Sequence, residues 1–254
     1  MVAPTIPTSP IVNAGLLYVD GLSISYSIPT KFILGAGVAR DALDTNDIVL
    51  SAPATISLDH VGINGLDTGT LTTGFMYAVY VIGDSTGYYP TAGIFSLSYG
   101  GPKMPIGYDL FRRVGFISTD VANLVRKFYQ TGTDETREYF YDTDSLTEVL
   151  FEGSSTTFDE VVIFPSVPII PTEVTFIVKY EQGNIANKAE FSTYGAIDTV
   201  QGMVIFGTGV VSTQYTQITV PCGIGSLGFP SILYRVGTTD KLKLNVSSYV
   251  DHLW

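Results

Sequence analysis

Cysteine, histidine and basic residues are scarce in this chain, and each shortage excludes a class of protein. Its 254 residues include one cysteine, Cys222, so no internal disulfide can form. Its two histidines, His60 and His252, cannot complete an HExxH or Cys/His zinc motif. Lysine and arginine number 13 against 24 acidic residues, which gives a net charge of −11 with no dense basic cluster. We therefore expect no nucleic-acid binding, because the chain would repel a phosphate backbone.

Long apolar runs are missing as well. The longest, such as 75–82, is far below the roughly 18 residues that a membrane-spanning helix needs. The opening segment, MVAPTIPTSPIVNAG, has no basic stretch and is interrupted by Pro4, Pro7 and Pro10, unlike a secretory signal peptide. We expect no membrane insertion, and folding without disulfides agrees with assembly in a reducing cytosol.

The residues that are abundant favour β-structure. Hydrophobic residues make up 45% of the chain and charged residues only 15%, with 16 tyrosines, 14 phenylalanines, 26 glycines and 13 prolines. Aromatic and β-branched residues favour strands, while glycine and proline favour the tight turns between them. The length is sufficient for one large β domain or two smaller ones with a substantial core.

Alternation of apolar and polar residues locates several strands. EVTFIVKY (173–180) and KLKLNVSSYV (241–250) each place apolar side chains on one face and polar ones on the other. FMYAVYVIG (75–83) is apolar on both faces, as in a central strand. Shorter strands are predicted at 161–165, 216–221 and 231–236.

The segment 119–130, TDVANLVRKFYQ, permits two interpretations. Asp120 could cap a helix with apolar residues at helical spacing. We favour a hairpin, with RRVGFIS before it, LVRKFYQ after it, and Asp120 to Asn123 as the turn.

A polar segment, EGSSTTFDE, separates two strand-rich regions and indicates a domain boundary. We predict an all-β fold with an N-terminal arm and first strands at 1–36, a β-rich region at 37–149, and a C-terminal antiparallel β-sandwich, jelly-roll-like, at 150–254. The first 12 residues, rich in proline, are expected to be an extended arm.

The motif Asp67-Thr68-Gly69-Thr70 resembles the catalytic loop of an aspartic protease. Such an enzyme needs two aspartates that share a proton, and the other Asp-Thr pair, Asp198-Thr199, lacks the following glycine. The alternative is a single loop completed by dimerisation. Because Asn64-Gly65 precede the motif where a strand is required, we favour a turn without catalytic function.

Other chemistry has weaker support in the sequence. No G-x-S-x-G motif is present to pair with His60 or His252, and Cys222 is expected to be a small filler at a strand end. The acidic run 133–148 contains Asp142 and Asp144, but it lacks the calcium-loop pattern, so a solvated hairpin face is favoured over an ion site. We expect no enzyme activity, no metal and no cofactor.

Three tyrosines are candidates for contact with a glycan or another partner. Tyr88, Tyr89 and Tyr99 lie in STGYYPTAGIFSLSYGGP, where glycine and proline predict turns that could present rings to solvent. Packing in the core or against another subunit is the alternative interpretation.

Several motifs, taken in order, resemble a module of virion proteins from tailed bacteriophages and prophages. They are GVARDALDTNDIVLSA (37–52), GLDTGTL (65–71), YAVYVIGDSTG (77–87), FSLSYGGPKMPIGYDLFRRVGFISTD (95–120), EVLFEGSSTTF (148–158) and LYRVGTTDKLKLNVSSYVDHLW (233–254). The resemblance covers most of the chain from about residue 37, and it depends on the order of the motifs.

The resemblance implies a structural virion protein: a tail fibre, head fibre, tail-tip component or capsid decoration. It further implies a β-rich homo-oligomer, with a trimer favoured, that contacts other virion proteins of the capsid, portal or tail. Location in the virion, after assembly in the host cytoplasm, follows from the same resemblance. A receptor- or glycan-binding module at a phage tip is the alternative, and an aspartic-type hydrolase that uses Asp67 in a dimer is the third.

Overall fold

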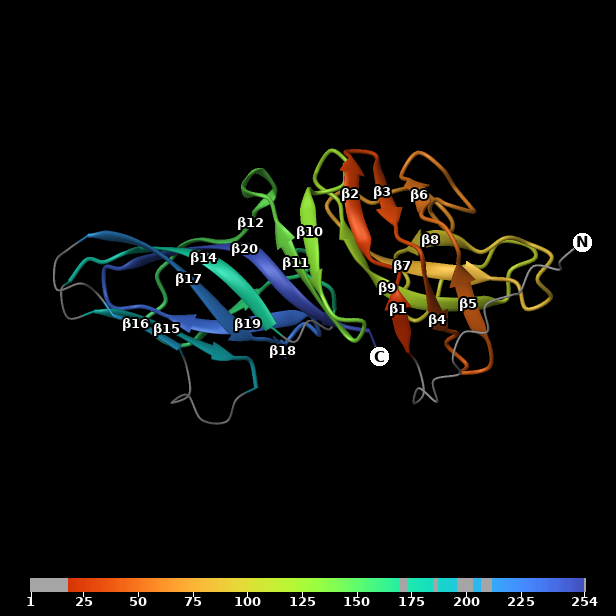
Figure 1. Cartoon of the computed structure of the whole chain (residues 1–254). Helices are drawn as coiled ribbons and strands as arrows, with labels where there is room; N and C mark the ends of the chain where they lie inside the picture. The colour runs from red at the N-terminus through yellow and green to blue at the C-terminus, as the bar shows by residue number, and fades with distance from the viewer. Residues whose placement is uncertain (1–17, 170–172, 185–186, 196–202, 207–211, 254) are drawn as a thin grey trace, which may run out of the picture.

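The computed structural model, shown in Figure 1, describes residues 18–169, 173–184, 187–195, 203–206 and 212–253. These residues form antiparallel β-sheets and one 3-10 turn, Thr143–Ser145, without an α-helix. The prediction of an all-β antiparallel fold is confirmed. In the same ranges, no helix has the length and hydrophobicity to cross a bilayer.

Three three-stranded sheets build one end of the elongated molecule, on the right in Figure 1. Their orders are β8-β7-β9, β1-β4-β5 and β2-β3-β6. The strands are β1 (Val19–Gly21), β2 (Ile24–Ile28), β3 (Lys31–Leu34), β4 (Gly37–Arg40), β5 (Asp47–Leu50), β6 (Ala54–Ser57), β7 (Met76–Gly83), β8 (Ala92–Ser96) and β9 (Leu110–Ser118).

Strand β7 is the centre of this end of the molecule, as its uninterrupted apolar sequence predicts. All eight of its residues are buried. Side chains of the two small sheets lie close against the β8-β7-β9 sheet. A Cβ on Gly93 of β8 would lie 2.4 Å from Ile56 of β6, and a Cβ on Gly83 of β7 would lie 3.2 Å from Ile48 of β5. The small sheets β2-β3-β6 and β1-β4-β5 therefore pack directly on the β8-β7-β9 sheet, which explains the burial of β7.

A β-sandwich forms the other end of the molecule, on the left in Figure 1, and confirms the predicted sandwich. One sheet has the order β10-β11-β20-β14-β17, with β12 also on β20, and the other has the order β13-β19-β15-β16, with β18 on β19. The strands are β10 (Phe128–Gly132), β11 (Thr136–Tyr141), β12 (Thr147–Gly153), β13 (Asp159–Val162), β14 (Glu173–Glu181), β15 (Lys188–Thr193), β16 (Met203–Phe206), β17 (Thr213–Pro221), β18 (Gly223–Ile224), β19 (Pro230–Arg235) and β20 (Lys241–His252).

The predicted division of the chain at 149/150 falls inside β12. Strands β10 and β11 precede that point, yet β11 pairs with β20 over the register Thr136↔His252 to Phe140↔Ser248. The larger sheet of the sandwich therefore includes strands from both sides of the predicted boundary. Of the predicted arm and first strands at 1–36, β1 to β3 belong to the small sheets, and the proline-rich first 12 residues lie outside the described part.

The predicted hairpin, with arms 112–118 and 124–130, forms only next to its turn. Asp120 Oδ1 accepts hydrogen bonds from the N–H groups of Ala122 and Leu124, at 2.8 and 2.9 Å, and Thr119 forms an antiparallel bridge with Val125. The Arg126 N–H still donates to the Ser118 carbonyl at 2.9 Å, but beyond Arg126 the two arms separate, because β10 pairs with β11 instead of β9. Side-chain capping by Asp120 thus stabilises a tight turn, not the first turn of a helix.

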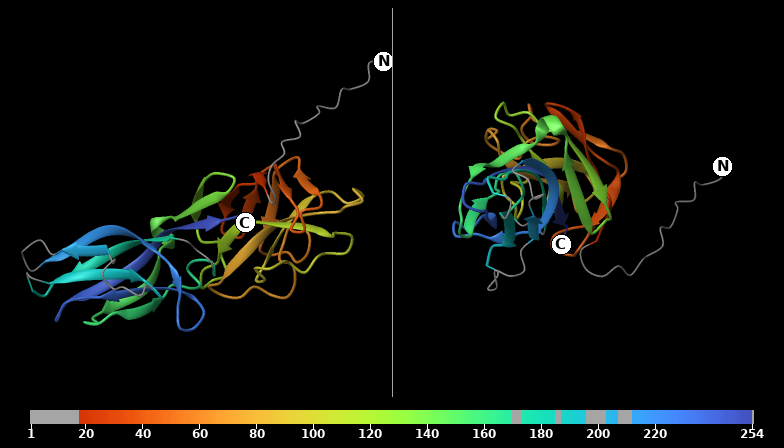
Figure 2. Two further views of the ribbon diagram at one scale, coloured as in Figure 1. Left: turned by 90° about the horizontal axis from the view of Figure 1, so that it is seen from below. Right: turned by 90° about the vertical axis from the view of Figure 1, so that its left-hand side faces the viewer.

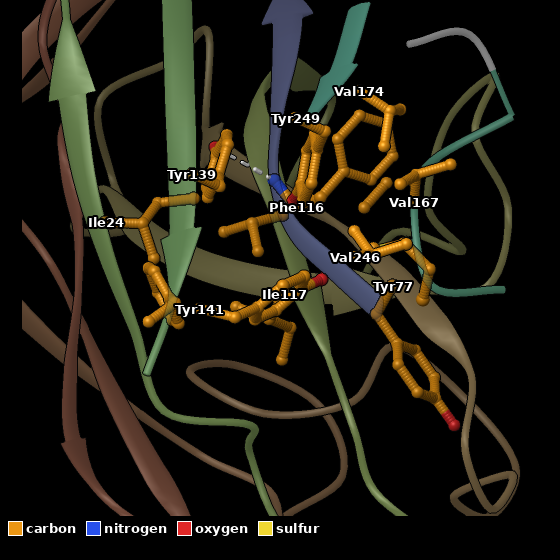
Figure 3. Close-up of a cluster of buried hydrophobic side chains, with 14 of the residues drawn as sticks. Ile24, Tyr77, Phe116, Ile117, Tyr139, Tyr141, Val167, Val174, Val246 and Tyr249 are labelled. Atoms are coloured by element: carbon orange, nitrogen blue, oxygen red, sulfur yellow. Dashed lines mark hydrogen bonds between the residues drawn. The ribbon is translucent and has the colours of Figure 1, made fainter. Parts of the chain in front are cut away.

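A cluster of aromatic side chains joins the two ends of the molecule (Figure 3). Tyr139 of β11 stacks on Tyr249 of β20, with ring centroids 4.8 Å apart, and its hydroxyl accepts a hydrogen bond of 3.2 Å from the N–H of Phe116 in β9. Gly115, the preceding residue, makes this approach feasible, since a Cβ there would lie 1.9 Å from the Tyr139 hydroxyl oxygen. The sandwich and the smaller sheets therefore share one core.

Two arginines of β9 fix the end of β20 at the same junction. One Arg113 nitrogen lies 2.9 and 2.7 Å from the two carboxylate oxygens of Asp251, and its other nitrogen donates to the carbonyl of His252 at 2.6 Å. Arg112 donates to the carbonyl of Leu253 at 2.5 Å. Although fraying is the default near a sequence end, His252 is held in the last rung of β20, and its Nδ1 lies 3.1 Å from the Thr136 hydroxyl.

Candidate functional site

The loops at the free end of the β8-β7-β9 sheet form an aromatic surface that we call the tyrosine tip, made of Tyr88, Tyr89, Ile106, Gly107 and Tyr108. The register Gly83↔Leu110 and Ile82↔Ala92 brings the loop after β7 and the loop before β9 to the same edge. In Figures 1 and 2 this edge lies at the end of the molecule farthest from the sandwich. The tip is thus exposed on loops that a buried sheet supports.

Asp84 organises the first loop of the tip. One of its carboxylate oxygens accepts the backbone N–H groups of Tyr88 and Tyr89, at 2.8 and 2.9 Å, and the other accepts the N–H of Thr86 at 2.9 Å. These hydrogen bonds, that from Tyr89 first, hold the pKa of the Asp84 carboxyl below its usual value. Because two consecutive tyrosine amides share one anchor, the backbone from which both side chains project is held in place before any ligand arrives.

A second carboxylate, from the start of β9, ties the same loop to the sheet. Asp109 accepts the N–H of Ser85 at 2.8 Å and its hydroxyl at 2.5 Å, and the Asp109 N–H donates to the carbonyl of Gly83 at 3.1 Å. The start of the loop is therefore tied to the start of β9, and the two bonds from Ser85 to the Asp109 carboxylate are charge-assisted.

The rings of the tip form a graded series from buried to exposed. Tyr108 is 6% exposed and donates its hydroxyl hydrogen to the Pro90 carbonyl at 2.8 Å. Tyr89, 40% exposed, lies 5.8 Å from Tyr108 between centroids, and Tyr88, 82% exposed, meets Tyr89 edge to face at 5.0 Å. Each ring supports the next one outward, which leaves Tyr88 open to solvent on a rigid base.

Glycine at position 107 is required for this stack. A Cβ there would lie 2.3 Å from the Tyr89 ring, and the backbone has φ +89, a conformation that favours glycine. Ile106, the preceding residue, is 96% exposed. An aromatic ring, Tyr88, and an aliphatic side chain, Ile106, are thus largely exposed to solvent at one end of the molecule, as in binding surfaces.

The chemistry of the tip is that of recognition. Ring faces of tyrosine stack on the C–H surfaces of sugars or on apolar side chains, and little conformational entropy is lost when the rings are already fixed. The nearby carboxylates of Asp84 and Asp109 are occupied by the hydrogen bonds of their own loop. A neutral ligand therefore suits the tip better than an anion, which the net charge of −11 would repel.

Tyr99, predicted to belong with Tyr88 and Tyr89, lies in a different environment. Its ring packs on Phe116 at 5.4 Å, and its hydroxyl donates to the Met76 carbonyl at 3.2 Å. Burial raises the pKa of its hydroxyl. Tyr99 is near Tyr88 and Tyr89 in sequence, but strand β8 lies between them. Tyr99 therefore follows the opposite end of β8, where its ring packs against the core.

The stretch around Asp67 is a structural clamp. The Asp67 N–H donates to the Phe95 carbonyl at 2.9 Å, which places the stretch along the edge of β8. Its carboxylate accepts the Ser96 hydroxyl at 2.7 Å and the Lys103 N–H at 2.8 Å, and thus holds the loop that follows β8. The favoured interpretation as a turn agrees with this geometry. Asp198, the other aspartate of the protease hypothesis, lies outside the described residues.

Gly69 is expected to stabilise the stretch around Asp67 only through its backbone conformation. Its φ is +80, and a Cβ there would meet no atom within 4 Å, so alanine would add strain without a clash. We expect Gly69→Ala to lower the free energy of unfolding by about 1 kcal/mol in urea titrations. Gly100→Ala is the matched control, since it adds a Cβ in open space without a positive φ, and it should change stability by less than about 0.5 kcal/mol. Equal effects of the two variants would contradict the role given to φ at Gly69.

The remaining candidates do not assemble into a reactive site. Asp142 pairs with Lys127 at 2.7 Å and caps the 3-10 turn through the Asp144 N–H, and no group of three or more acidic, cysteine or histidine residues converges in the described ranges. Burial raises the pKa of the Cys222 thiol to about 12, which leaves it protonated and unreactive. His60 is exposed in the loop that follows β6, and its carbonyl accepts the Leu66 N–H at 2.8 Å.

The sequence did not identify Ile106, Gly107 and Tyr108 as parts of the tip, or Asp84 as the residue that anchors its first loop. One signal for Asp84 was present: an Asp-Ser-Thr-Gly run directly after a buried strand is typical of a side-chain-capped turn. No comparable signal existed for Ile106, because only the pairing of β7 with β9 brings it to Tyr88.

Comparisons with known proteins leave the family of the chain open. No model of a known protein family matches it, and no curated protein matches its sequence. Among solved structures, a carbohydrate binding module (CBM6cm-2) from Cellvibrio mixtus lichenase 5A in complex with cellotriose shares 14% identity at a TM-score of 0.20, covering 50% of this chain and 86% of that one. Arthrobacter globiformis T6 isomalto-dextranse complexed with panose shares 10% identity at a TM-score of 0.20, with 91% of this chain and 33% of that chain covered. At these values neither similarity bears on function.

Proposed function

We propose that this protein is a non-catalytic binding protein that recognises a neutral carbohydrate through the tyrosine tip. The observation that supports the proposal best is the exposure of Tyr88, at 82%, on a loop fixed by Asp84. A large apolar ring exposed on a flexible loop has little meaning, but here hydrogen bonds and two further rings hold it in place.

Binding assays with point variants test this proposal. The protein should bind at least one neutral oligosaccharide on a glycan array, and Tyr88→Ala and Tyr89→Ala should each weaken that binding by about 30-fold, or about 2 kcal/mol, in calorimetry. Tyr129→Ala is the control, because Tyr129 is also an exposed tyrosine, at 67%, but lies on β10 in the larger sheet of the sandwich. Absence of any glycan signal, or equal losses in all three variants, would overturn the proposal.

A further variant changes the arrangement of the tyrosine rings in the tip without removing any of them. Gly107→Ala should displace the Tyr89 ring, because the added Cβ would lie 2.3 Å from it. We expect binding to fall as it does in Tyr89→Ala, while stability decreases by only about 1–2 kcal/mol from the backbone strain. Unchanged affinity in this variant would show that the fixed stack is unnecessary for recognition.

As a second candidate we propose a structural role in a tailed-phage virion, as a fibre-like, tail-associated or capsid-surface appendage. The resemblance of ordered motifs from residue 37 onward supports it, and so does the placement of the tip at one end of an elongated molecule whose two ends share a core. The protein should then co-purify with phage particles of its source and be visible on them with gold-labelled antibody. If purified particles did not contain the protein, this candidate would be rejected, and the carbohydrate proposal would be unaffected.

A further inference from the structure

Strand β17 is an unusual edge strand. It has nine residues, Thr213–Pro221, and pairs with β14 along its whole length without a bulge. The other end strands of the described sheets have two to five residues, apart from β12, whose ladder is irregular, and β9, whose outer groups meet Ala42 and Tyr139. Proteins normally keep free edges short, charged or bulged, because a long regular edge pairs with other strands. β17 has none of these protections.

The free backbone groups of β17 can be assigned from its register. Gln182 donates its N–H to the Ser212 carbonyl at 3.1 Å, in the same register that places Glu181 opposite Thr213. In an antiparallel ladder, hydrogen-bonded and non-bonded pairs alternate, so the even-numbered residues of β17 bond to β14. The N–H and C=O groups of Thr213, Tyr215, Gln217 and Thr219 therefore point away from the sheet. No described strand pairs with that side.

This row of free groups is complementary to itself. A two-fold axis at Gln217 would place Gln217 opposite its copy and Tyr215 opposite Thr219 on each side, all of them residues with outward backbone groups. Tyrosine beside threonine is a favourable cross-strand pair. Pro221, which has no N–H, would end the ladder opposite Thr213.

Charge also favours a second copy as the occupant. The chain carries −11, yet β17 contains no charged residue, whereas its neighbour β14 contains Glu173, Lys179 and Glu181. Two acidic molecules can approach along an uncharged edge without placing like charges opposite each other. Tyr215, 71% exposed, lies two residues from Gln217, the central residue of that edge.

We propose that two copies of this chain associate through β17, antiparallel and in register about Gln217, so that the two larger sheets become one continuous sheet. This interface is independent of the tyrosine tip. It also differs from the trimer that the resemblance implies, since a strand pair of this kind closes with two-fold symmetry.

Charge variants at the axis test the proposal with the full chain. Sedimentation of the wild type at micromolar concentration should give twice the chain mass of 27.4 kDa. Gln217→Lys and Gln217→Glu each place like charges opposite one another and should weaken self-association by about tenfold or more. An equimolar mixture of the two variants should restore the two-chain species, because the ammonium introduced in one chain would then face the carboxylate introduced in the other.

Thr55→Lys is the matched control, since Thr55 is an exposed residue of the short edge strand β6, and this variant should associate as the wild type does. Circular dichroism melts establish that all variants are folded. A monomeric wild type would overturn the proposal. So would a trimer, or a dimer that persists unchanged in both Gln217 variants.

Discussion

Replacing Gly115 with alanine is expected to lower the free energy of unfolding by about 3 kcal/mol or more. The new methyl would lie 1.9 Å from the Tyr139 hydroxyl oxygen and 2.9 Å from Cδ1 of Ile24, and the backbone has φ +148. Tyr139 is fully buried and stacked on Tyr249, so it has no space into which to retreat. Urea unfolding followed by circular dichroism measures the effect.

A double-mutant cycle separates the clash from the backbone strain. Tyr139→Phe alone removes the hydrogen bond to the Phe116 N–H and should cost about 1–3 kcal/mol, because that donor is left without a partner. In the Gly115→Ala background the same change should stabilise the protein, since it removes the atom that the methyl meets. Additive effects of the two substitutions would contradict the proposed contact.

The second large effect concerns the Arg113–Asp251 pair. The Asp251 side chain is fully buried and the Arg113 side chain is 12% exposed, so removal of the guanidinium leaves a buried carboxylate without its counter-charge. We expect Arg113→Met to lower the free energy of unfolding by about 3–5 kcal/mol at pH 7. Asp251→Asn in the Arg113→Met background should recover part of this loss. If the double variant were less stable than Arg113→Met, the loss could not be assigned to the unpaired charge.

The pH dependence of this pair has a defined sign. Burial raises the pKa of Asp251 to about 6, while Arg113, then His252 and Arg137, act to lower it. Because the folded pKa is above the ordinary value of 3.8, the contribution of this group to stability is complete below about pH 4 and declines as the pH rises through 6. Arg113→Met removes the main group that lowers the pKa of Asp251. The substitution should therefore be less damaging at pH 4, where the carboxyl is protonated with or without Arg113, than at pH 7, where the ionised carboxylate of the wild type depends on the guanidinium. A deficit that stays the same at both pH values would contradict this account.

Local sequence pattern predicted the strands well, because alternation and burial are properties of a few neighbouring residues. β14, β20 and the buried β7 all lie where their sequences place them. The junction was not predictable, since Arg113 and Asp251 lie 138 positions apart and belong to different sheets, so only the packing of β9 against β11 and β20 brings them together. The predicted boundary at 149/150 could not anticipate this, because a polar segment indicates a loop or strand end, not which sheet the flanking strands join.

The candidate site was predictable in part for the same reason. Tyr88 and Tyr89 follow a strong turn signal, and both are exposed. Tyr99 follows a similar signal, but its ring turns toward Phe116, a contact that depends on the course of β9. Ile106 and Gly107 have no distinctive sequence context and gain a role only where the loop before β9 meets the loop after β7.

Strand β20 also determines when the protein can fold. It pairs with β14 on one side and with β11 and β12 on the other, so without β20 these strands are not joined into one sheet. During synthesis, strands β10 to β17 emerge from the ribosome before residues 241–252 and must wait with open edges and exposed tyrosines. Pairing across such sequence separation is slow, and waiting strands are prone to aggregate. We expect a nascent chain halted before β20 to be protease-sensitive and to require chaperones, and a released chain that includes β20 to be resistant.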